Sequence, residues 1–394
     1  MQEREEAARP VGRGPRWPVP VVAGGLLVGV AGVAMLGPRG ADGDGGTATT
    51  VAFAADADPL TICVRASLED RAALVLVVGL PGVTDADDPL VDELAAVGVG
   101  GVMLRDENIR SEEQVTDLVA GLRSRLGPGL LVAVDDEGGR VSSMGALDQD
   151  LTSARRLGQR DEEAVEEAGA ELGELAASVG IDWVFAPVAD LDDGPASGVI
   201  GDRSFGDDPD EVATAAGAFA RGLRSASVAV TAKHFPGHGG TGDPHLGSTV
   251  DPAPLDTLVA EDLVPFRTLI DEGAEAVMVG HVTYPEVWPE RPASLDPGAY
   301  ELLRAEGFEG VAITDALGMG AIHSRYGFDA APAMAVAAGA DAVLVNQGNQ
   351  VRTLHDGLVA AVRDGRLDES RLDQAVGRVL TLRGEAPDGT VCAS

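Results

Sequence analysis

Basic residues are scarce in this sequence, and lysine is almost missing from it. The 394 residues include 64 acidic and 29 basic side chains, which gives a formal net charge of -35. Nucleic-acid binding needs a positively charged surface for the phosphates, so this balance argues against a nucleic-acid partner. Lys233 is the single lysine, and every other basic residue is arginine. Because the two side chains differ in shape and donor geometry, the lone lysine is a candidate for a specific role.

Aromatic residues and cysteines are also few. Aromatic residues make up 4% of the sequence, so a long polysaccharide groove lined by stacking rings is not expected, whereas a small pocket is. The two cysteines, Cys63 and Cys392, form no CxxC motif and no Cys/His zinc spacing. In an oxidising compartment we predict a disulfide between them that joins the two ends of one domain. The alternative is two free thiols.

A hydrophobic, uncharged run lies near the N-terminus at 21–37, and four arginines precede it. Its length is near the lower limit for spanning a bilayer, and the basic flank places the N-terminus inside and the rest outside. We predict a basic flank at 1–20, a transmembrane anchor or signal segment at 21–37 and a flexible linker at 38–59. The folded domain at 60–394 is then extracytoplasmic, either anchored or secreted. A buried core helix at 21–37 is the alternative.

Short apolar runs alternate with longer amphipathic stretches along 60–394. Eight of the runs have the composition of buried strands, and helical patterns such as 162–178, 255–271 and 330–338 lie between most of them. This alternation indicates an α/β fold with a parallel sheet covered on both faces, and it predicts a single (β/α)8 TIM-type barrel. A doubly wound sheet is the alternative, but no G-x-G-x-x-G follows the first strand. The predicted strands are 73–79, 98–104, 130–134, 182–186, 228–232, 274–279, 310–314 and 341–345.

Polar or ionisable side chains follow six of these strands. In a (β/α)8 barrel the C-terminal ends of the strands form the catalytic face, so this convergence predicts an enzyme. The residues at these places are Asp135, Asp190, Lys233 with His234, His281, Asp315 and Asn346.

The segment 233–245 is the densest group of such side chains, with three of the six histidines and a glycine-rich loop. It ends in Asp243-Pro244-His245, where the carboxylate can hydrogen-bond the imidazole and stabilise its cation, as suits a general acid/base. Asp315, at the end of a buried strand, is a nucleophile, a ligand-binding group or part of a buried ion pair. A carboxylate nucleophile with a separate proton donor is what retaining glycoside hydrolysis requires.

Other chemistries for this segment are less well supported by its pattern. A metal site could use His234, His238, Asp243 and His245 as ligands. No familiar spacing such as H-E-x-x-H is present and Lys233 would repel a cation, so we expect no metal and no cofactor. A phosphate loop is disfavoured because G-x-x-x-x-G-K-[ST] is missing. We expect His238 to be structural and to bond the loop backbone.

These segments resemble the β-N-acetylglucosaminidase (β-N-acetylhexosaminidase) branch of glycoside hydrolase family 3. They occur in the family's order and cover nearly the whole folded region, and the K-H-F-P-G-H-G…D-x-H segment is highly specific to this branch. The resemblance implies a single (β/α)8 barrel, in agreement with the strand count. The matching segments are VDDEGGRV (134–141), IDWVFAPVADL (181–191), VIGDRSFG (199–206), KHFPGHGGTGDPH (233–245), HVTYPEVWPERPASL (281–295), ITDALGMGAI (313–322) and AGADAVLV (338–345).

The resemblance also implies roles for individual residues. Asp315 matches the catalytic nucleophile, and His245 matches the acid/base on the loop with Asp243 as its partner. The positions that match sugar-binding residues are Asp135, Arg203, Lys233 and His234.

Three further positions or pairs in the matching segments carry expectations of their own. We expect Glu137 and Arg140 to form an internal ion pair. Ser143 stands where the family often has an arginine, which puts one sugar contact in doubt. Pro244 stands where many members have serine.

The implied activity is that of a retaining exo-glycosidase that releases terminal β-linked N-acetylglucosamine from peptidoglycan-derived glycans. The expected partner is a small carbohydrate, the chain is expected to be a monomer, and it would meet the membrane only through its N-terminal segment. Three alternatives stay open: a β-glucosidase-like or phosphorolytic family member, an inactive anchored sugar-binding protein, and a metal-dependent hydrolase.

Overall fold

The computed structural model describes residues 66–148, 152–239, 241–243, 247 and 249–385. The chain divides into two units, 1–54 and 55–394, and the described residues all belong to the second. The predicted segments 1–20, 21–37 and 38–59 lie outside the described residues, as do Cys63, Cys392 and His245. No helix within the described ranges is long and apolar enough to cross a membrane.

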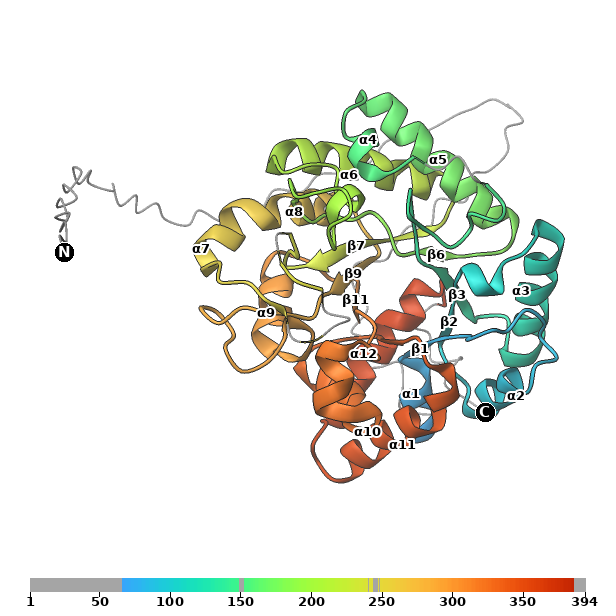
Figure 1. The fold of residues 1–394 in the computed structure, drawn as a ribbon. Helices are drawn as coiled ribbons and strands as arrows, with labels where there is room; N and C mark the ends of the chain where they lie inside the picture. Colours follow the sequence, from blue (N-terminus) through green and yellow to red (C-terminus); the bar gives the residue numbers. More distant parts are fainter. Residues whose placement is uncertain (1–65, 149–151, 240, 244–246, 248, 386–394) are drawn as a thin grey trace, which may run out of the picture. The chain divides into compact units, whose positions relative to one another are not determined.

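Eight parallel strands form the central sheet (Figure 1), in the order β11-β9-β7-β6-β3-β2-β1-β12. Its two ends meet, because Ile313 of β11 forms a parallel bridge with Ala342 and the Thr314 N–H donates to the Ala342 carbonyl at 3.2 Å. The predicted barrel and all eight predicted strands are therefore confirmed. The strands are β1 Leu76–Gly79, β2 Gly101–Leu104, β3 Leu131–Val134, β6 Trp183–Val184, β7 Ala229–Phe235, β9 Ala276–Val279, β11 Val311–Thr314 and β12 Val343–Val345.

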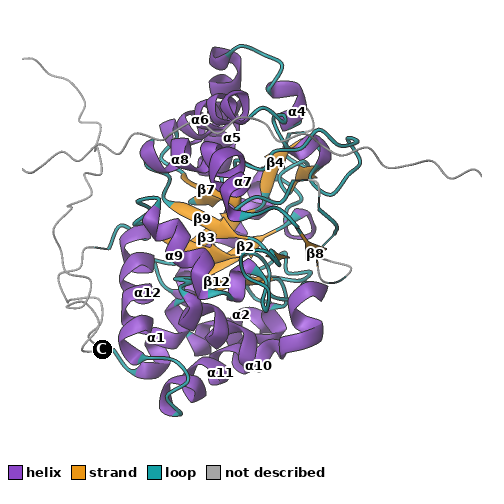
Figure 2. Cartoon of the chain, turned by 90° about the vertical axis from the view of Figure 1, so that its left-hand side faces the viewer, coloured by secondary structure: helices purple, strands orange, loops and turns teal. Residues whose placement is uncertain are grey.

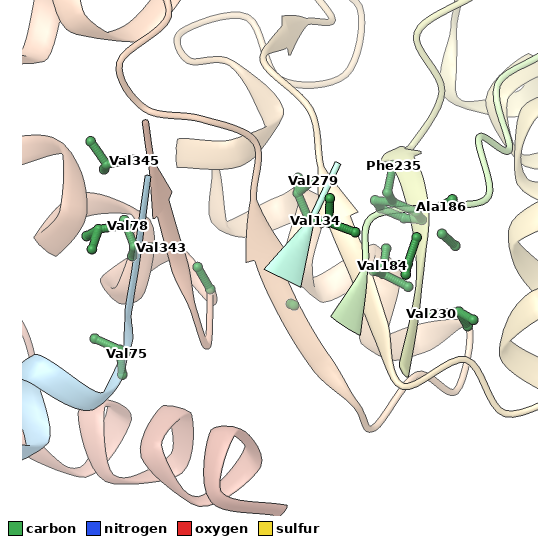
Figure 3. Packing of buried hydrophobic residues seen from close by; sticks show 14 of the residues in the cluster. Val75, Val78, Val134, Val184, Ala186, Val230, Phe235, Val279, Val343 and Val345 are labelled. Atoms are coloured by element: carbon green, nitrogen blue, oxygen red, sulfur yellow. The ribbon is translucent and has the colours of Figure 1, made fainter. Parts of the chain in front are cut away.

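Alternate residues of each strand face the inside and the outside of the barrel. Leu131 and Ala133 of β3 belong to a small apolar cluster that the barrel encloses. Val132 and Val134 belong to a much larger cluster between the strands and the helices, part of which Figure 3 shows around Val134. Because both faces are buried, the strands read as continuous apolar runs in the sequence.

Helices surround the sheet, and Figure 2 shows them on both sides of the strands. Their starts follow from the sequence: Asp161 caps α5 by accepting from the Ala164 N–H at 3.0 Å, and Asp208 with Pro209 begins α6. The helices are α1 Leu68–Leu74, α2 Pro89–Val97, α3 Glu112–Leu126, α4 Ala154–Leu157, α5 Glu162–Ser178, α6 Pro209–Ser225, α7 Leu255–Thr257, α8 Leu263–Asp271, α9 Pro297–Ala305, α10 Gly320–Ala338, α11 Val351–Arg363 and α12 Glu369–Leu382.

Two helices differ from a regular α-helix. The predicted helix 255–271 is interrupted between α7 and α8 by a π-helical turn at Leu258–Asp262. The segment assigned as α10 contains Gly327, which has non-helical backbone angles (φ 73°, ψ 166°). It is therefore two helices joined at a kink, and the predicted helix 330–338 lies in the second of them.

Candidate active site

Lys233 lies at the centre of the polar residues at the C-terminal face of the barrel. It is on β7 and only 1% exposed, and its Nζ is 2.6 Å from Asp135 Oδ1 and 2.5 Å from Glu137 Oε1. Burial lowers the pKa of Lys233, but Asp135 and Glu137 outweigh burial and raise it above its ordinary value. The ammonium has three N–H donors, and the two carboxylates take two of them. Asp135 is the most accessible of the three, with 38% of its side chain exposed.

Arg203 holds the other side of Glu137. The short 3₁₀ helix Gly201–Arg203 places the guanidinium so that its Nε and Nη2 donate to the two Glu137 oxygens, each at 2.7 Å. Burial raises the pKa of Glu137, but Arg203 and Lys233 together bring it far below its ordinary value. Glu137 is thus a buried anion between two cations.

The predicted ion pair between Glu137 and Arg140 is wrong. Gly138 and Gly139 both have positive φ, 75° and 59°, and the turn they make sends Glu137 inward and leaves Arg140 exposed. Arg140 instead pairs with Asp202, with Nε and Oδ1 2.7 Å apart, and donates to the Ile200 carbonyl at 2.8 Å.

His234 is fixed by Asp190, which the sequence placed at a strand end without assigning it a role. Asp190 is fully buried; its Oδ2 is 2.7 Å from His234 Nδ1, and its Oδ1 accepts from the His234 backbone N–H at 3.1 Å. The other ring nitrogen, Nε2, is 3.3 Å from Arg203 Nη2. Arginine only donates, so a hydrogen bond in this contact is accepted by Nε2 and leaves the Nδ1 proton facing Asp190.

Asp315 directly follows β11 and is 7% exposed. Its backbone N–H donates to the Val279 carbonyl at 3.0 Å, and its Oδ1 accepts from the Ala316 N–H at 2.7 Å. Burial raises the pKa of Asp315, but His281, His234, the Ala316 N–H and Lys233 together lower it below its ordinary value. The carboxylate is therefore ionised at neutral pH, as a nucleophile must be.

The described part of the loop after β7 is anchored at its root. The His238 backbone N–H donates to Asp190 Oδ1 at 2.8 Å, and its ring Nδ1 is 2.9 Å from the Thr241 hydroxyl. The Thr241 hydroxyl also donates to the His238 carbonyl at 2.8 Å, so these two residues hold each other within the described part of the loop. Asp243 is half-buried, whereas Pro244 and His245 lie outside the described residues, so the predicted Asp243–His245 dyad remains a prediction.

Two remaining positions complete this face. The Ser143 hydroxyl donates to the Asp135 carbonyl at 2.6 Å, so it supports the backbone of Asp135 where the family often has an arginine. Asn346 follows β12, and its Oδ1 is buried without a hydrogen-bond partner among the described residues. Within the same ranges, no group of three His, Cys, Asp or Glu side chains is arranged to hold a metal ion.

The site therefore places one ionised carboxylate, Asp315, near a set of hydrogen-bond donors and acceptors. Lys233 and Arg203 are donors, Asp135 is an acceptor, and His234 lies between Asp190 and Arg203. Such a set suits a small ligand with several hydroxyl groups beside a nucleophile. Sequence reasoning found these residues through their places after strands, except for Arg203, which only the family resemblance indicated, and it missed the roles of Asp190 and Glu137.

Comparison with known proteins agrees with this geometry. Residues 69–382 match the model of the glycosyl hydrolase family 3 N-terminal domain. Beta-hexosaminidase LpqI of Mycobacterium tuberculosis is 40% identical over 344 residues, which cover 84% of this chain and 86% of that protein. A beta-hexosaminidase of Stenotrophomonas maltophilia is 39% identical over 315 residues, or 77% and 91% of the two chains.

Two solved structures are similar in fold. That of M. tuberculosis LpqI has a TM-score of 0.77 at 40% identity and covers 83% of this chain and 97% of that one. A glycoside hydrolase family 3 β-N-acetylglucosaminidase from Paenibacillus has a TM-score of 0.76 at 35% identity, with 81% and 62% covered.

Proposed function

The chain belongs to glycosyl hydrolase family 3 and is a glycoside hydrolase, and from that premise we propose that it releases terminal β-linked N-acetylglucosamine with retention of configuration. Its relatives are named beta-hexosaminidases, which supports the same activity here. The observation that carries the proposal is the ionised Asp315 at the end of β11, with Lys233 and His234 of β7 close enough to lower its pKa.

The donors and acceptors around Asp315 would bind the sugar ring. Asp135 is the exposed acceptor for sugar hydroxyls, and the third N–H of Lys233 and the Arg203 guanidinium are the donors beside it. Glu137 and Asp190 lie behind them and hold the cations and the His234 ring in place. The sugar would therefore meet a pre-oriented set of groups, which lowers the entropic cost of reaching the transition state.

The reaction would proceed in two displacements. In the first, an Asp315 carboxylate oxygen attacks the anomeric carbon, the glycosidic C–O bond breaks, and the leaving oxygen takes a proton from the His245 imidazolium. In the second, a water oxygen attacks the same carbon, the bond to Asp315 breaks, and neutral His245 takes the proton from the water. Asp243 would stabilise the imidazolium. Both the enzyme and its proton are restored.

The natural substrate and place of action are inferred from the sequence. The basic flank and apolar run at 21–37 support an extracytoplasmic enzyme, and a terminal N-acetylglucosamine there would come from peptidoglycan fragments. Labelling of intact cells with a reagent that does not cross the membrane tests the location. A protected catalytic domain in intact cells would contradict it.

The activity is tested with the full-length chain and an aryl β-N-acetylglucosaminide, with the aryl β-glucoside and β-xyloside as matched controls. We expect turnover of the aminosugar substrate, and the first sugar released should be the β-anomer by NMR. Replacing Asp315 by Asn should lower kcat by about 10³-fold or more, because it removes the covalent catalyst. Binding of the sugar without any turnover would support a sugar-binding protein, and near-normal turnover by Asp315→Asn would remove Asp315 from the mechanism.

A further inference from the structure

His281 is a fully buried histidine that the mechanism above does not use. It follows β9, which pairs with β11, so it lies beside the residues that come after β11. Its Nε2 is 3.1 Å from the Ala316 carbonyl oxygen and its Nδ1 is 2.7 Å from Ser294 Oγ. A carbonyl oxygen only accepts, so Nε2 carries a proton in this contact, while the Ser294 hydroxyl can donate to Nδ1 or accept from it.

Ser294 is in turn held rigidly. It is fully buried in the short 3₁₀ helix Ala293–Leu295. Its backbone N–H donates to the Gly280 carbonyl at 3.0 Å, and its carbonyl accepts from the Tyr300 hydroxyl at 2.8 Å. The backbone of Ser294 is therefore held on both sides, and its hydroxyl lies in place to hold the His281 ring.

Ala316 connects this pair to the nucleophile. Its N–H donates to Asp315 Oδ1 at 2.7 Å, while its carbonyl receives the His281 hydrogen bond. The two groups belong to adjacent peptide planes joined at the Ala316 Cα, so a displacement of this residue away from His281 would also move the N–H that orients the carboxylate. A hydrogen bond that favours the ionised carboxylate becomes weaker when its donor moves away.

We propose that His281, with its ring held by Ser294, is a positioning residue that fixes the reactive orientation of the Asp315 carboxylate through Ala316. The inference rests on the proposed function, because it takes Asp315 as the nucleophile. His281 touches neither the sugar nor the reacting atoms in this role. Among the described residues, the charged and titratable groups that act on Asp315 are His281 after β9, Lys233 and His234 on β7 and His238 after it.

The test compares His281→Leu, His281→Gln and Ser294→Ala in the full-length enzyme. His281→Leu removes the donor to Ala316, so kcat should fall about 10- to 100-fold while KM changes little, because the carboxylate is misplaced but the sugar groups are intact. The acidic limb of kcat/KM should move to higher pH by about 0.5–1 unit, because the ionised carboxylate loses support. The glutamine in His281→Gln can still donate to the Ala316 carbonyl. This variant should therefore keep most of the wild-type kcat and the wild-type position of the acidic limb.

Ser294→Ala keeps the His281 ring but removes the hydroxyl that holds it, so it should move the acidic limb of kcat/KM in the same direction by a smaller amount. Leu295→Ala is the matched control: Leu295 is a fully buried neighbour of Ser294 with no polar group, so this variant should lower the unfolding temperature and leave the limb unchanged. The inference would be overturned if the acidic limb of kcat/KM moved equally in Leu295→Ala, or if it stayed at the wild-type pH in both His281→Leu and Ser294→Ala. If instead wild type is inactive or Asp315→Asn is fully active, the proposed function itself fails.

Discussion

Lys233 occupies a site shaped for a compact cation. Its side chain is 1% exposed, and its Nζ lies within 2.6 Å of both Asp135 and Glu137. Arg203 already takes both oxygens of Glu137 in a fork geometry. A second guanidinium would therefore find too little space and no free face on Glu137, although it carries the same charge.

We accordingly expect Lys233→Arg to lower kcat/KM by about 10²-fold, because displaced sugar-binding groups cost that much in related situations. The measurement is steady-state kinetics with the aryl substrate, together with the unfolding temperature. Arg221→Lys, in an exposed group of ion pairs on α6, is the control and should leave the kinetics unchanged. An unaltered kcat/KM in Lys233→Arg would show that the lone lysine is not needed for its shape.

Glu137 has a different role, since it lies 2% exposed between two cations. Glu137→Gln would leave Lys233 and Arg203 facing each other with one fewer anion, so we expect a loss of about 3–5 kcal/mol in the free energy of unfolding and a higher KM. Chemical denaturation at pH 7 measures it. Glu166→Gln removes an exposed partner of Arg221 and should cost less than about 1 kcal/mol. Similar losses in the two variants would contradict the role of Glu137 as a buried bridge.

Single residues also show where sequence reasoning ends. The spacing of Glu137 and Arg140 suggested a local pair, but the direction of each side chain depends on the backbone angles of Gly138 and Gly139. Lys233 and Asp135 were predicted at one site because both follow strands, and they are in contact. Their shared partner Glu137 could not be predicted, because it is chosen by the three-dimensional turn and not by spacing.

At the level of elements, the π-helical turn at Leu258–Asp262 brings a carboxylate against the root of the loop after β7. A Cβ on Gly237, which has φ +140°, would lie 2.9 Å from Asp262 Oδ1, so the two residues are in close contact. Burial, followed by Asp251, Asp190 and Glu261, raises the pKa of Asp262 to about 7. The ordinary value for an aspartate is near 3.9.

Because the pKa of Asp262 is higher in the folded state, the fold favours its protonated form. The stability that this contributes is fully present below about pH 4 and is lost as the pH rises to about 7. Asp262→Asn cannot ionise, so it should be as stable as wild type near pH 4 and more stable at pH 8. Unfolding temperatures from pH 4 to 8 measure this.

The control for this experiment is Asp256→Asn, an exposed carboxylate on α7 whose replacement should leave the profile of wild type unchanged. A smaller decline up to about pH 6 should persist in Asp262→Asn, because burial also raises the pKa of Asp136 to about 6. Parallel profiles for wild type and Asp262→Asn would contradict the prediction.

The elements were predictable to different degrees. Helix α5, Glu162–Ser178, coincides with the predicted range because its cap and its apolar face are both local signals. The π-helical turn was not predicted, because the apolar pattern of 255–271 continues through it. The first half of α10 was missed because Gly327 breaks the pattern before the predicted start of that helix.

At the scale of the whole molecule, the net charge of -35 is the dominant electrostatic feature. Exposed arginine pairs such as Arg125 with Asp92 each contribute little, whereas the excess of like charge repels itself throughout the surface. Salt weakens both effects, so the larger of the two should determine whether the unfolding temperature rises or falls. We therefore expect about 0.5 M NaCl to raise the unfolding temperature by about 2 °C, with an equal osmolality of sucrose as the control. A lower unfolding temperature in salt than in sucrose would show that the ion pairs dominate.

Barrel closure explains why distant segments could be assigned to one site from the sequence. The contact of Lys233 with Asp135 joins residues on β7 and after β3, and Asp315 follows β11. In a parallel barrel every strand ends at the same face, so the positions of the strands predict which side chains meet. The distances and partners within the site depend on loop conformations, which the strand pattern does not determine.

The pairing of β1 with β12 has a consequence for how the chain is made. Leu76 pairs with Val343, so β1 cannot pair with β12 until roughly 270 further residues have left the ribosome. At about 5–20 residues per second this takes on the order of 15 to 50 seconds, during which β1 presents an unpaired strand edge. The nascent barrel is thus open to wrong partners for most of its synthesis, and a newly made chain of this kind would depend on chaperones that cover that edge until β12 arrives.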